Sequence, residues 1–194
     1  MKEYKLPIGC DVPETIILAD GDFPSHPLAL EWLRQCPYVV CCDGAANTYI
    51  RSGRMPEAIV GDGDSLLPDI KERYASLIHS EAEQETNDLS KAFRFCLSQE
   101  RKRITIMGAT GKREDHTIGN VSLLADYMEQ AEVSMMTDYG IFVPIREDSM
   151  FESYIGQQIS VFNMNSTALS AEGLAYPLSA VSYTHLTLPT KRIV

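Results

Sequence analysis

Long apolar runs and an excess of positive charge are both missing from this sequence. No apolar run in the 194 residues approaches the roughly 20 residues that a helix needs to cross a bilayer. The segment from Met1 to Asp11 lacks the apolar core of a signal peptide. Lysines and arginines number 17 against 27 aspartates and glutamates, which gives a net charge of −10. These absences argue against a membrane protein and against a nucleic-acid partner.

Paired cysteines are missing as well. The five cysteines form an odd set without a C-x-x-C spacing, and they are Cys10, Cys36, Cys41, Cys42 and Cys96. We therefore expect no structural disulfide, no zinc site and a reduced, cytoplasmic protein. Cys41 and Cys42 lie in an apolar run, where core packing is the ordinary role of a cysteine.

Strand-like and helix-like segments alternate through the first two thirds of the chain. Short apolar runs that end in turn residues indicate buried strands, and apolar residues at helical spacing indicate helices between them. We expect strands at 15–19, 38–42, 58–60, 77–79, 103–107 and 132–136, and helices at 27–35, from about 44, at 68–76, 89–99 and 116–130. This alternation predicts an α/β domain over residues 1–137 with a doubly wound, mostly parallel sheet.

The pattern changes after residue 137. Short β-like runs at 140–145, 158–162 and 168–171, separated by turn residues, predict a small, incomplete β-sandwich domain over 138–182. Residues 183–194 have β-like composition but few turn signals. They are either an edge strand or a tail of foreign origin.

An acidic, glycine-rich motif follows the strand expected at 58–60. In Gly61-Asp62-Gly63-Asp64-Ser65, an extended backbone would turn the Asp62 and Asp64 carboxylates to the same side. Adjacent carboxylates repel each other, and a divalent cation that prefers oxygen ligands, such as Mg²⁺, relieves that repulsion. A solvated turn is the alternative, since Gly and Asp are both common in turns.

Two further aspartates stand where expected helices begin. Asp43 is followed by Gly44 and other small residues, so it either caps the helix or belongs to a turn that lets phosphate oxygens approach the helix amides. Asp88 opens the helix at 89–99, where it either favours the helix dipole or adds a carboxylate to a metal site. Neither segment contains the Walker sequence or the G-x-G-x-x-G fingerprint.

The loop after the strand at 103–107 combines glycines with cations. Glycines permit close approach of a ligand, while Lys112 and Arg113 offer positive charge to phosphate oxygens. Asp115 orients Arg113 or His116, or caps the following helix, and Asn120 lies one turn beyond His116. Ligands of doubly wound sheets bind outside the carboxyl ends of the strands. Because all of these motifs fall at such positions, the sequence predicts one shared site.

Four ordered segments together resemble the thiamin pyrophosphokinase family. They are Cys42-Asp43-Gly44-Ala45-Ala46-Asn47, Gly61-Asp62-Gly63-Asp64-Ser65, Glu85-Thr86-Asn87-Asp88 and residues 108–120 with Arg113-Glu114-Asp115-His116, and a later strand at 173–178 is also similar. The resemblance covers about residues 16–182. Gly63 departs from it, since a bulky apolar residue is usual there, and Asn87 separates Thr86 from Asp88.

The resemblance implies ATP-dependent transfer of a diphosphoryl group to the hydroxyl of thiamin, with Mg²⁺ and with release of AMP. It implies a nucleotide-binding α/β domain, a β-sandwich that contributes to a thiamin site between subunits, and a homodimer. It also implies that Asp43, Asp62, Asp64 and Asp88 surround Mg²⁺ and the triphosphate, one of them serving as general base. The nucleotide-binding residues that it implies are Gly44, Asn47, Ser65, Thr86, Gly108, Gly111, Lys112, Arg113, Asp115, His116 and Asn120.

Two other functions stay open at this point. One is a different Mg²⁺-dependent nucleotide phosphotransferase, which would release ADP if it were a simple kinase. The other is a non-catalytic nucleotide- or thiamin-binding domain, because the glycine–serine–asparagine segment that family members place near thiamin is not found before Val194. That departure predicts Mg–ATP binding with weak or absent thiamin turnover.

Overall fold

A computed structural model describes the chain except for residues 8–10, 81–84, 165–167, 177, 182–189 and 194. The chain divides into two compact units, one over Ile8–Ile145 and the other over Met1–Pro7 together with Arg146–Val194. The α/β domain was expected over residues 1–137, and the observed unit begins and ends later in the chain. No helix in the described part of the chain combines the length and the apolar character that a bilayer crossing requires.

A seven-stranded sheet forms the centre of the larger unit in the described part of the chain. Its spatial order is β5-β4-β3-β2-β6-β7-β8. All neighbouring strands are parallel except β8, which turns back antiparallel onto β7. The strands are β2 (Thr15–Leu18), β3 (Val39–Cys42), β4 (Ala58–Gly61), β5 (Ile78–Ser80), β6 (Arg103–Met107), β7 (Glu132–Met136) and β8 (Ile141–Phe142). The predicted doubly wound, mostly parallel sheet is confirmed, and its order reverses at β2, between β3 and β6.

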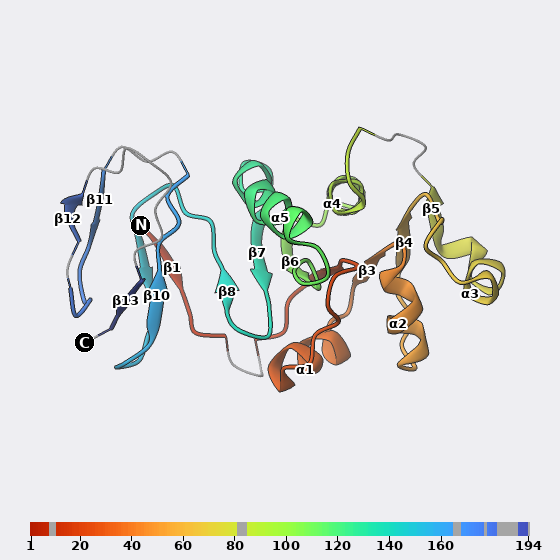
Figure 1. Cartoon of the computed structure of the whole chain (residues 1–194), viewed down its shortest axis with the longest axis horizontal. Helices are drawn as coiled ribbons and strands as arrows, with labels where there is room; N and C mark the ends of the chain where they lie inside the picture. The colour runs from red at the N-terminus through yellow and green to blue at the C-terminus, as the bar shows by residue number, and fades with distance from the viewer. Residues whose placement is uncertain (8–10, 81–84, 165–167, 177, 182–189, 194) are drawn as a thin grey trace. The chain divides into compact units, whose positions relative to one another are not determined.

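Helices cover both faces of this sheet, with α4 and α5 on one face and α1 and α2 on the other (Figure 1). Successive strand residues point to opposite faces, so Ile16 and Leu18 pack with α1 and α2 while Ile17 packs with α4 and α5. Because both faces are covered, every residue of β2 is buried, which explains its uninterrupted apolar run. The helices are α1 (Pro27–Gln35), α2 (Ala45–Arg51), α3 (Pro68–Arg73), α4 (Asp88–Ser98) and α5 (Glu114–Tyr127), with a 3-10 turn η1 at Ala75–Leu77.

The turn between β7 and β8 anchors the start of α1. The Asp138 carboxylate accepts hydrogen bonds from the backbone N–H groups of Ser25 (2.9 Å) and His26 (2.8 Å), and from the Ser25 hydroxyl. These bonds to the ionised form lower the pKa of Asp138, with the Ser25 hydroxyl as the largest cause. One carboxylate therefore joins two loops at the same edge of the sheet.

Replacement of Asp138 by Ala is expected to lower the stability of the larger unit at neutral pH by about 1 kcal/mol, as for loss of a helix-capping side chain. A carboxyl whose pKa is lowered by folding stabilises the protein above the unfolded-state pKa and loses that contribution as the pH falls. The difference between wild type and variant should therefore shrink below about pH 4. Thermal unfolding at pH 7 and at pH 3 measures it, and an equal difference at both pH values would contradict this role.

The smaller unit consists of strand pairs. Strand β1 (Lys2–Tyr4) pairs in parallel with β9 (Ser149–Phe151), and the Tyr4 and Phe151 rings stack with centroids 4.7 Å apart. The antiparallel pairs are β10 (Gln158–Ser160) with β13 (Thr190–Arg192) and β11 (Leu169–Ala171) with β12 (Leu178–Val181).

The segment 183–194, whose origin the sequence left open, lies largely outside the described residues. Its described part provides β13, and Ile193 forms a further antiparallel bridge with Leu174. The described end of the chain therefore contributes a strand to the smaller unit. The first seven residues, which were expected in the α/β domain, belong to this unit through β1.

Candidate functional site

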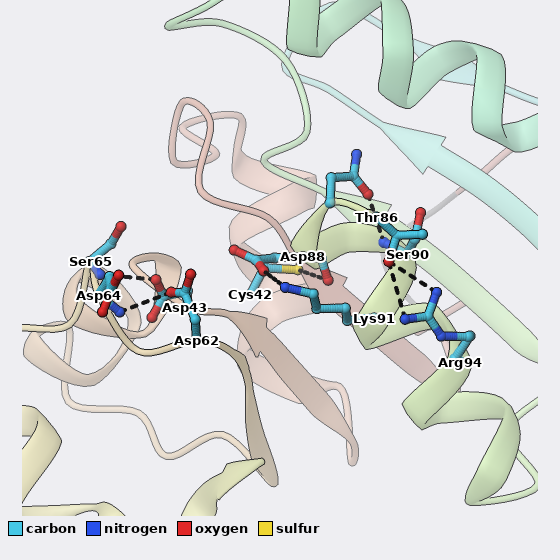
Figure 2. Close-up of polar contacts among 11 residues, drawn as sticks. Cys42, Asp43, Asp62, Asp64, Ser65, Thr86, Asp88, Ser90, Lys91 and Arg94 are labelled. Carbon is cyan, nitrogen blue, oxygen red and sulfur yellow. Dashed lines mark hydrogen bonds and ion pairs between the residues drawn. The ribbon is translucent and has the colours of Figure 1, made fainter. Parts of the chain in front are cut away.

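The acidic motifs lie together at the carboxyl ends of β3 and β4. Asp43 directly follows β3, Asp62 and Asp64 follow β4, and Asp88 is the first residue of α4. The N–H of Asp43 donates to the carbonyl of Val60 (3.0 Å), which extends the pairing of β3 with β4 into the acidic segment. Figure 2 shows Asp43, Asp62 and Asp64 on one side of the site and Asp88 on the other.

Asp43 is the most buried of the four carboxylates, with 3% of its surface exposed. Its Oδ2 accepts from the N–H of Ser65 (3.0 Å), whereas its Oδ1 is buried without a hydrogen-bond partner among the described residues. Burial raises the pKa of Asp43 above its ordinary value, and the nearby charges of Asp88 and Asp62 raise it further. A buried, unpartnered carboxylate oxygen beside two other acids is a suitable ligand for a cation.

Gly61 allows Asp43 and Asp88 to approach each other. A Cβ at Gly61 would lie 2.8 Å from the Cβ of Asp43 and 3.4 Å from the Cγ of Asp88. The missing side chain thus leaves the space into which both aspartates extend. Asp88 is fixed from its own side, because its carbonyl accepts from the Cys42 thiol (3.7 Å) and its Oδ1 pairs with the Lys91 ammonium (3.1 Å).

Asp62 and Asp64 are more exposed and belong to a turn. The N–H of Asp64 donates to Asp62 Oδ1 (3.0 Å), and the Lys71 ammonium donates to the carbonyl of Gly63 (2.9 Å). Gly63 has a backbone φ of +77°, which a bulky residue would adopt only with strain. The glycine that departs from the family pattern therefore has a conformational reason in this loop.

Two residues that the resemblance implies for nucleotide binding form hydrogen bonds to the loops around the site. Asn47 donates from Nδ2 to the carbonyl of Ser65 (2.8 Å) and accepts at Oδ1 from the N–H of Leu67 (3.0 Å). Asn120 is buried, and its Nδ2 donates to the carbonyl of Ala109 (2.8 Å) while its Oδ1 accepts from Asn87 Nδ2 (3.2 Å). Both amides are engaged with the protein, so they position the site.

The polar residues at the start of α4 also bond within the protein. The Asn87 side chain caps the helix by accepting from the N–H of Ser90 (2.9 Å). The Thr86 hydroxyl accepts from the guanidinium of Arg94 at 3.2 Å. Figure 2 shows Thr86 and Arg94 on the α4 side of the site, beyond Lys91.

The loop after β6 contains residues with positive backbone φ, as is common in glycine-rich loops that a ligand can approach closely. Gly108, Gly111 and Lys112 have φ values of +65°, +77° and +56°. The Lys112 ammonium pairs with Asp20 Oδ1 (3.0 Å), and the Arg113 guanidinium pairs with Asp115 (Nε to Oδ1, 3.1 Å). Arg113 lowers the pKa of the exposed Asp115 to about 2.

Of the three alternatives for Asp115, the structure shows the pairing with Arg113. Helix α5 begins at Glu114, and the side chain of Arg113, in the capping position, forms no capping hydrogen bond. The exposed His116 lies in its first turn. The cations of this loop are therefore available at the surface, each held by one carboxylate.

Sequence reasoning missed Asp20 and Lys91. Asp20-Gly21-Asp22 has the composition of an ordinary turn, yet it follows β2 at the centre of the sheet. Besides pairing with Lys112, Asp20 lies against Gly44, where a Cβ would come within 2.6 Å of its Oδ2. Its position after a central parallel strand was the available signal. Lys91, on α4, carried no signal beyond its spacing of three residues from Asp88.

The described side chains do not form a preassembled metal cage. Within the ranges that the structure describes, no group of three or more His, Cys, Asp or Glu side chains could hold one ion. Mg²⁺ is commonly bound by one or two carboxylates together with substrate phosphates and waters. Asp43, with its unpartnered oxygen, and Asp88 across Gly61 fit such a shared site.

The fold and the site define a doubly wound α/β protein with an acidic ligand site at the carboxyl ends of its strands. The model of the thiamin pyrophosphokinase catalytic domain matches residues 29–136, and the model of the family's substrate-binding domain matches residues 140–185. The chain therefore belongs to the thiamin pyrophosphokinase family.

Individual relatives agree with this assignment. Thiamine pyrophosphokinase 1 of Oryza sativa subsp. japonica is 30% identical over 129 residues, which cover 54% of this chain and 49% of the relative. The Bacillus subtilis thiamine pyrophosphokinase is 34% identical over 86 residues, which cover 42% of this chain and 40% of the relative. The chain thus spans about half the length of the rice relative and less of the bacterial one.

Solved structures share the fold. Thiamin pyrophosphokinase from Candida albicans superimposes with a TM-score of 0.75 at 18% identity, over 99% of this chain and 86% of that chain. The yeast enzyme gives a TM-score of 0.71 at 18% identity, over 99% of this chain and 84% of that chain.

Proposed function

We propose that this protein is a thiamin diphosphokinase that transfers a diphosphoryl group from ATP to the hydroxyl of thiamin. The observation that supports it most is the buried Oδ1 of Asp43, which has no hydrogen-bond partner among the described residues and lies near the charges of Asp62 and Asp88. All three residues fall inside the segment that matches the family's catalytic domain. Diphosphoryl transfer needs positioning and neutralisation of charge more than covalent catalysis, and this site offers both.

The proposed reaction is a single displacement. The thiamin hydroxyl oxygen forms a bond to the β-phosphorus of ATP, the bond from that phosphorus to the oxygen bridging the α-phosphate breaks, and AMP leaves with its oxygen. The hydroxyl proton passes to a carboxylate, for which Asp43, Asp62, Asp64 and Asp88 are the candidates. A bound Mg²⁺ would withdraw charge from the phosphate oxygens.

The residues take separate parts in this proposal. Asp43 and Asp88, which approach each other at Gly61, would hold the cation, and Asp62 and Asp64 would extend the acidic surface for the phosphates. Lys112 and Arg113 bind phosphate oxygens after release from Asp20 and Asp115, since both cations lie on the exposed β6 loop. Gly44, Gly108 and Gly111 let the nucleotide approach the backbone. Ser65, Thr86, Asp115, His116, Asn47 and Asn120 shape the site.

We assign ATP binding to the larger unit and part of the thiamin site to the smaller unit, which contains most of the match to the substrate-binding domain. The protein acts as a cytoplasmic homodimer in this proposal. Light scattering coupled to size-exclusion chromatography tests the dimer, which should have twice the mass of the chain.

Assay of AMP release from ATP tests the activity. Release should require both thiamin and Mg²⁺ and should match the thiamin diphosphate formed, one to one. Binding of Mg–ATP is measured separately by calorimetry, so that a nucleotide site without turnover is recognised. Formation of ADP, or saturable ligand binding without any AMP, would contradict the proposal in favour of a simple kinase or a non-catalytic binding domain.

A further inference from the structure

The acidic site contains one buried positive charge. Lys91 has 4% of its surface exposed, and its ammonium lies 3.1 Å from Asp88 Oδ1 (Figure 2). Among the described residues, Asp88 is the only one of the four site carboxylates with an ion-pair partner within 4 Å. The neighbouring Lys71 and Lys112 bond instead to the Gly63 carbonyl and to Asp20.

Helix α4 carries both residues of this pair. Lys91 and Asp88 are three residues apart on the helix, so their side chains extend from adjacent positions on one face. The Asp88 end is held from outside the helix as well, since the Asp88 carbonyl accepts from Cys42. The Lys91 side chain is buried and lies one turn from Asp88, so its ammonium is placed beside the acidic site.

A fixed ammonium at this position acts in opposite directions on two ligands. A divalent ion that arrives alone is repelled by Lys91 and meets one Asp88 oxygen already occupied. A divalent ion bound to a nucleoside triphosphate carries net negative charge, which the same ammonium attracts. The described residues offer no three-acid group for a lone ion, which agrees with this asymmetry.

We propose that Lys91 is the residue that makes this site select the metal–nucleotide complex over the free divalent ion. This inference rests on the proposed function, because it takes the acidic site at the carboxyl ends of β3 and β4 as the place where a metal and phosphates bind together. It assigns Lys91 a specificity role through charge, distinct from the exposed cations of the β6 loop.

The test compares two affinities in wild type and in Lys91→Met. Free Mn²⁺ binding is measured by electron paramagnetic resonance, and binding of Mn²⁺ with the α,β-methylene analogue of ATP is measured by calorimetry. In Lys91→Met, the affinity for free Mn²⁺ should rise by about 5- to 30-fold, and the affinity for the complex should fall by a similar factor. Opposite signs are the signature, since damage to the fold would lower both affinities.

Two variants serve as controls. Lys91→Arg keeps the charge and should stay close to wild type in both measurements. Lys102→Met removes the same charge at the exposed residue before β6, at the opposite edge of the sheet, and should change neither affinity. Equal affinities for free Mn²⁺ in wild type and Lys91→Met, or a fall in both affinities, would overturn the inference. Failure of wild type to bind the metal–nucleotide complex would instead remove the proposed function.

Discussion

Replacement of Asp43 by Asn is expected to weaken Mg²⁺-dependent nucleotide binding by at least about 100-fold and to remove diphosphoryl transfer. The neutral amide keeps an oxygen for the Ser65 N–H, so the loop contact survives. It loses the charge at the buried position where no other group of the described chain bonds to Oδ1. Calorimetry with Mg–ATP and the AMP-release assay measure the two losses.

The same substitution is expected to stabilise the protein in the absence of metal. Because burial raises the pKa of Asp43, its contribution to stability is present below the unfolded-state pKa and is lost as the pH rises through the folded-state pKa. A rise to pH 8 therefore costs the wild-type protein stability, because ionisation places charge on a buried oxygen that has no partner among the described residues. Asp43→Asn should unfold at a higher temperature there, by about 1 kcal/mol in stability, and the gain should vanish near pH 3.

Asp69→Asn provides the matched control. This exposed residue in the first turn of α3 changes the net charge equally, but its side chain is not one of the four site carboxylates. It should leave nucleotide affinity unchanged and alter stability by only a few tenths of a kcal/mol. Wild-type nucleotide affinity in Asp43→Asn, or a lower stability than wild type at pH 8, would count against a cation-binding role for Asp43.

The positions of the acidic residues at strand ends were predictable because they depend only on local sequence. Asp43, Asp62 and Asp64 each follow a short apolar strand, and the carboxyl ends of parallel strands form one edge. What the sequence could not provide is the distance between segments. The approach of Asp43 to Asp88 across Gly61 depends on how α4 packs beside β4, and no spacing along the chain encodes that contact.

Lys91 and β1 illustrate two further limits. A lysine inside a helix is ordinarily read as a solvated residue, and only the packed structure shows this one buried beside Asp88. Strand β1 has only three residues, two of them charged, and a segment this short shows no periodic pattern. Their partner β9, at Ser149–Phe151, is far away in the sequence, so the pairing depends on the tertiary fold.

Replacement of Gly21 by Ala is expected to cause the largest loss of stability among the loop glycines of the site. The loops after β2 and β6 are joined by bonds from the N–H of Gly21 to the carbonyl of Gly108 (2.6 Å) and from the N–H of Asp22 to the carbonyl of Thr110 (2.8 Å). A Cβ at Gly21 would lie 2.4 Å from the first carbonyl oxygen and 2.3 Å from the second. Both oxygens belong to the backbone and cannot rotate away, so the loops after β2 and β6 must move apart to admit the Cβ.

We expect Gly21→Ala to lose about 3 kcal/mol of stability, which for a chain of this size corresponds to a fall of roughly 6–12 °C in the unfolding midpoint. Separation of the loops also displaces the β6 loop, and Lys112 with it, from its place beside Asp20, so nucleotide affinity should fall with stability. Gly119→Ala is the matched control, because Gly119 is an exposed residue within α5 and a Cβ there meets no atom within 4 Å. That substitution should stabilise the helix by about 0.5–1 kcal/mol. If the two variants unfolded at the same temperature, the close approach of the β2 and β6 loops would not be what holds Asp20 and Lys112 at the site.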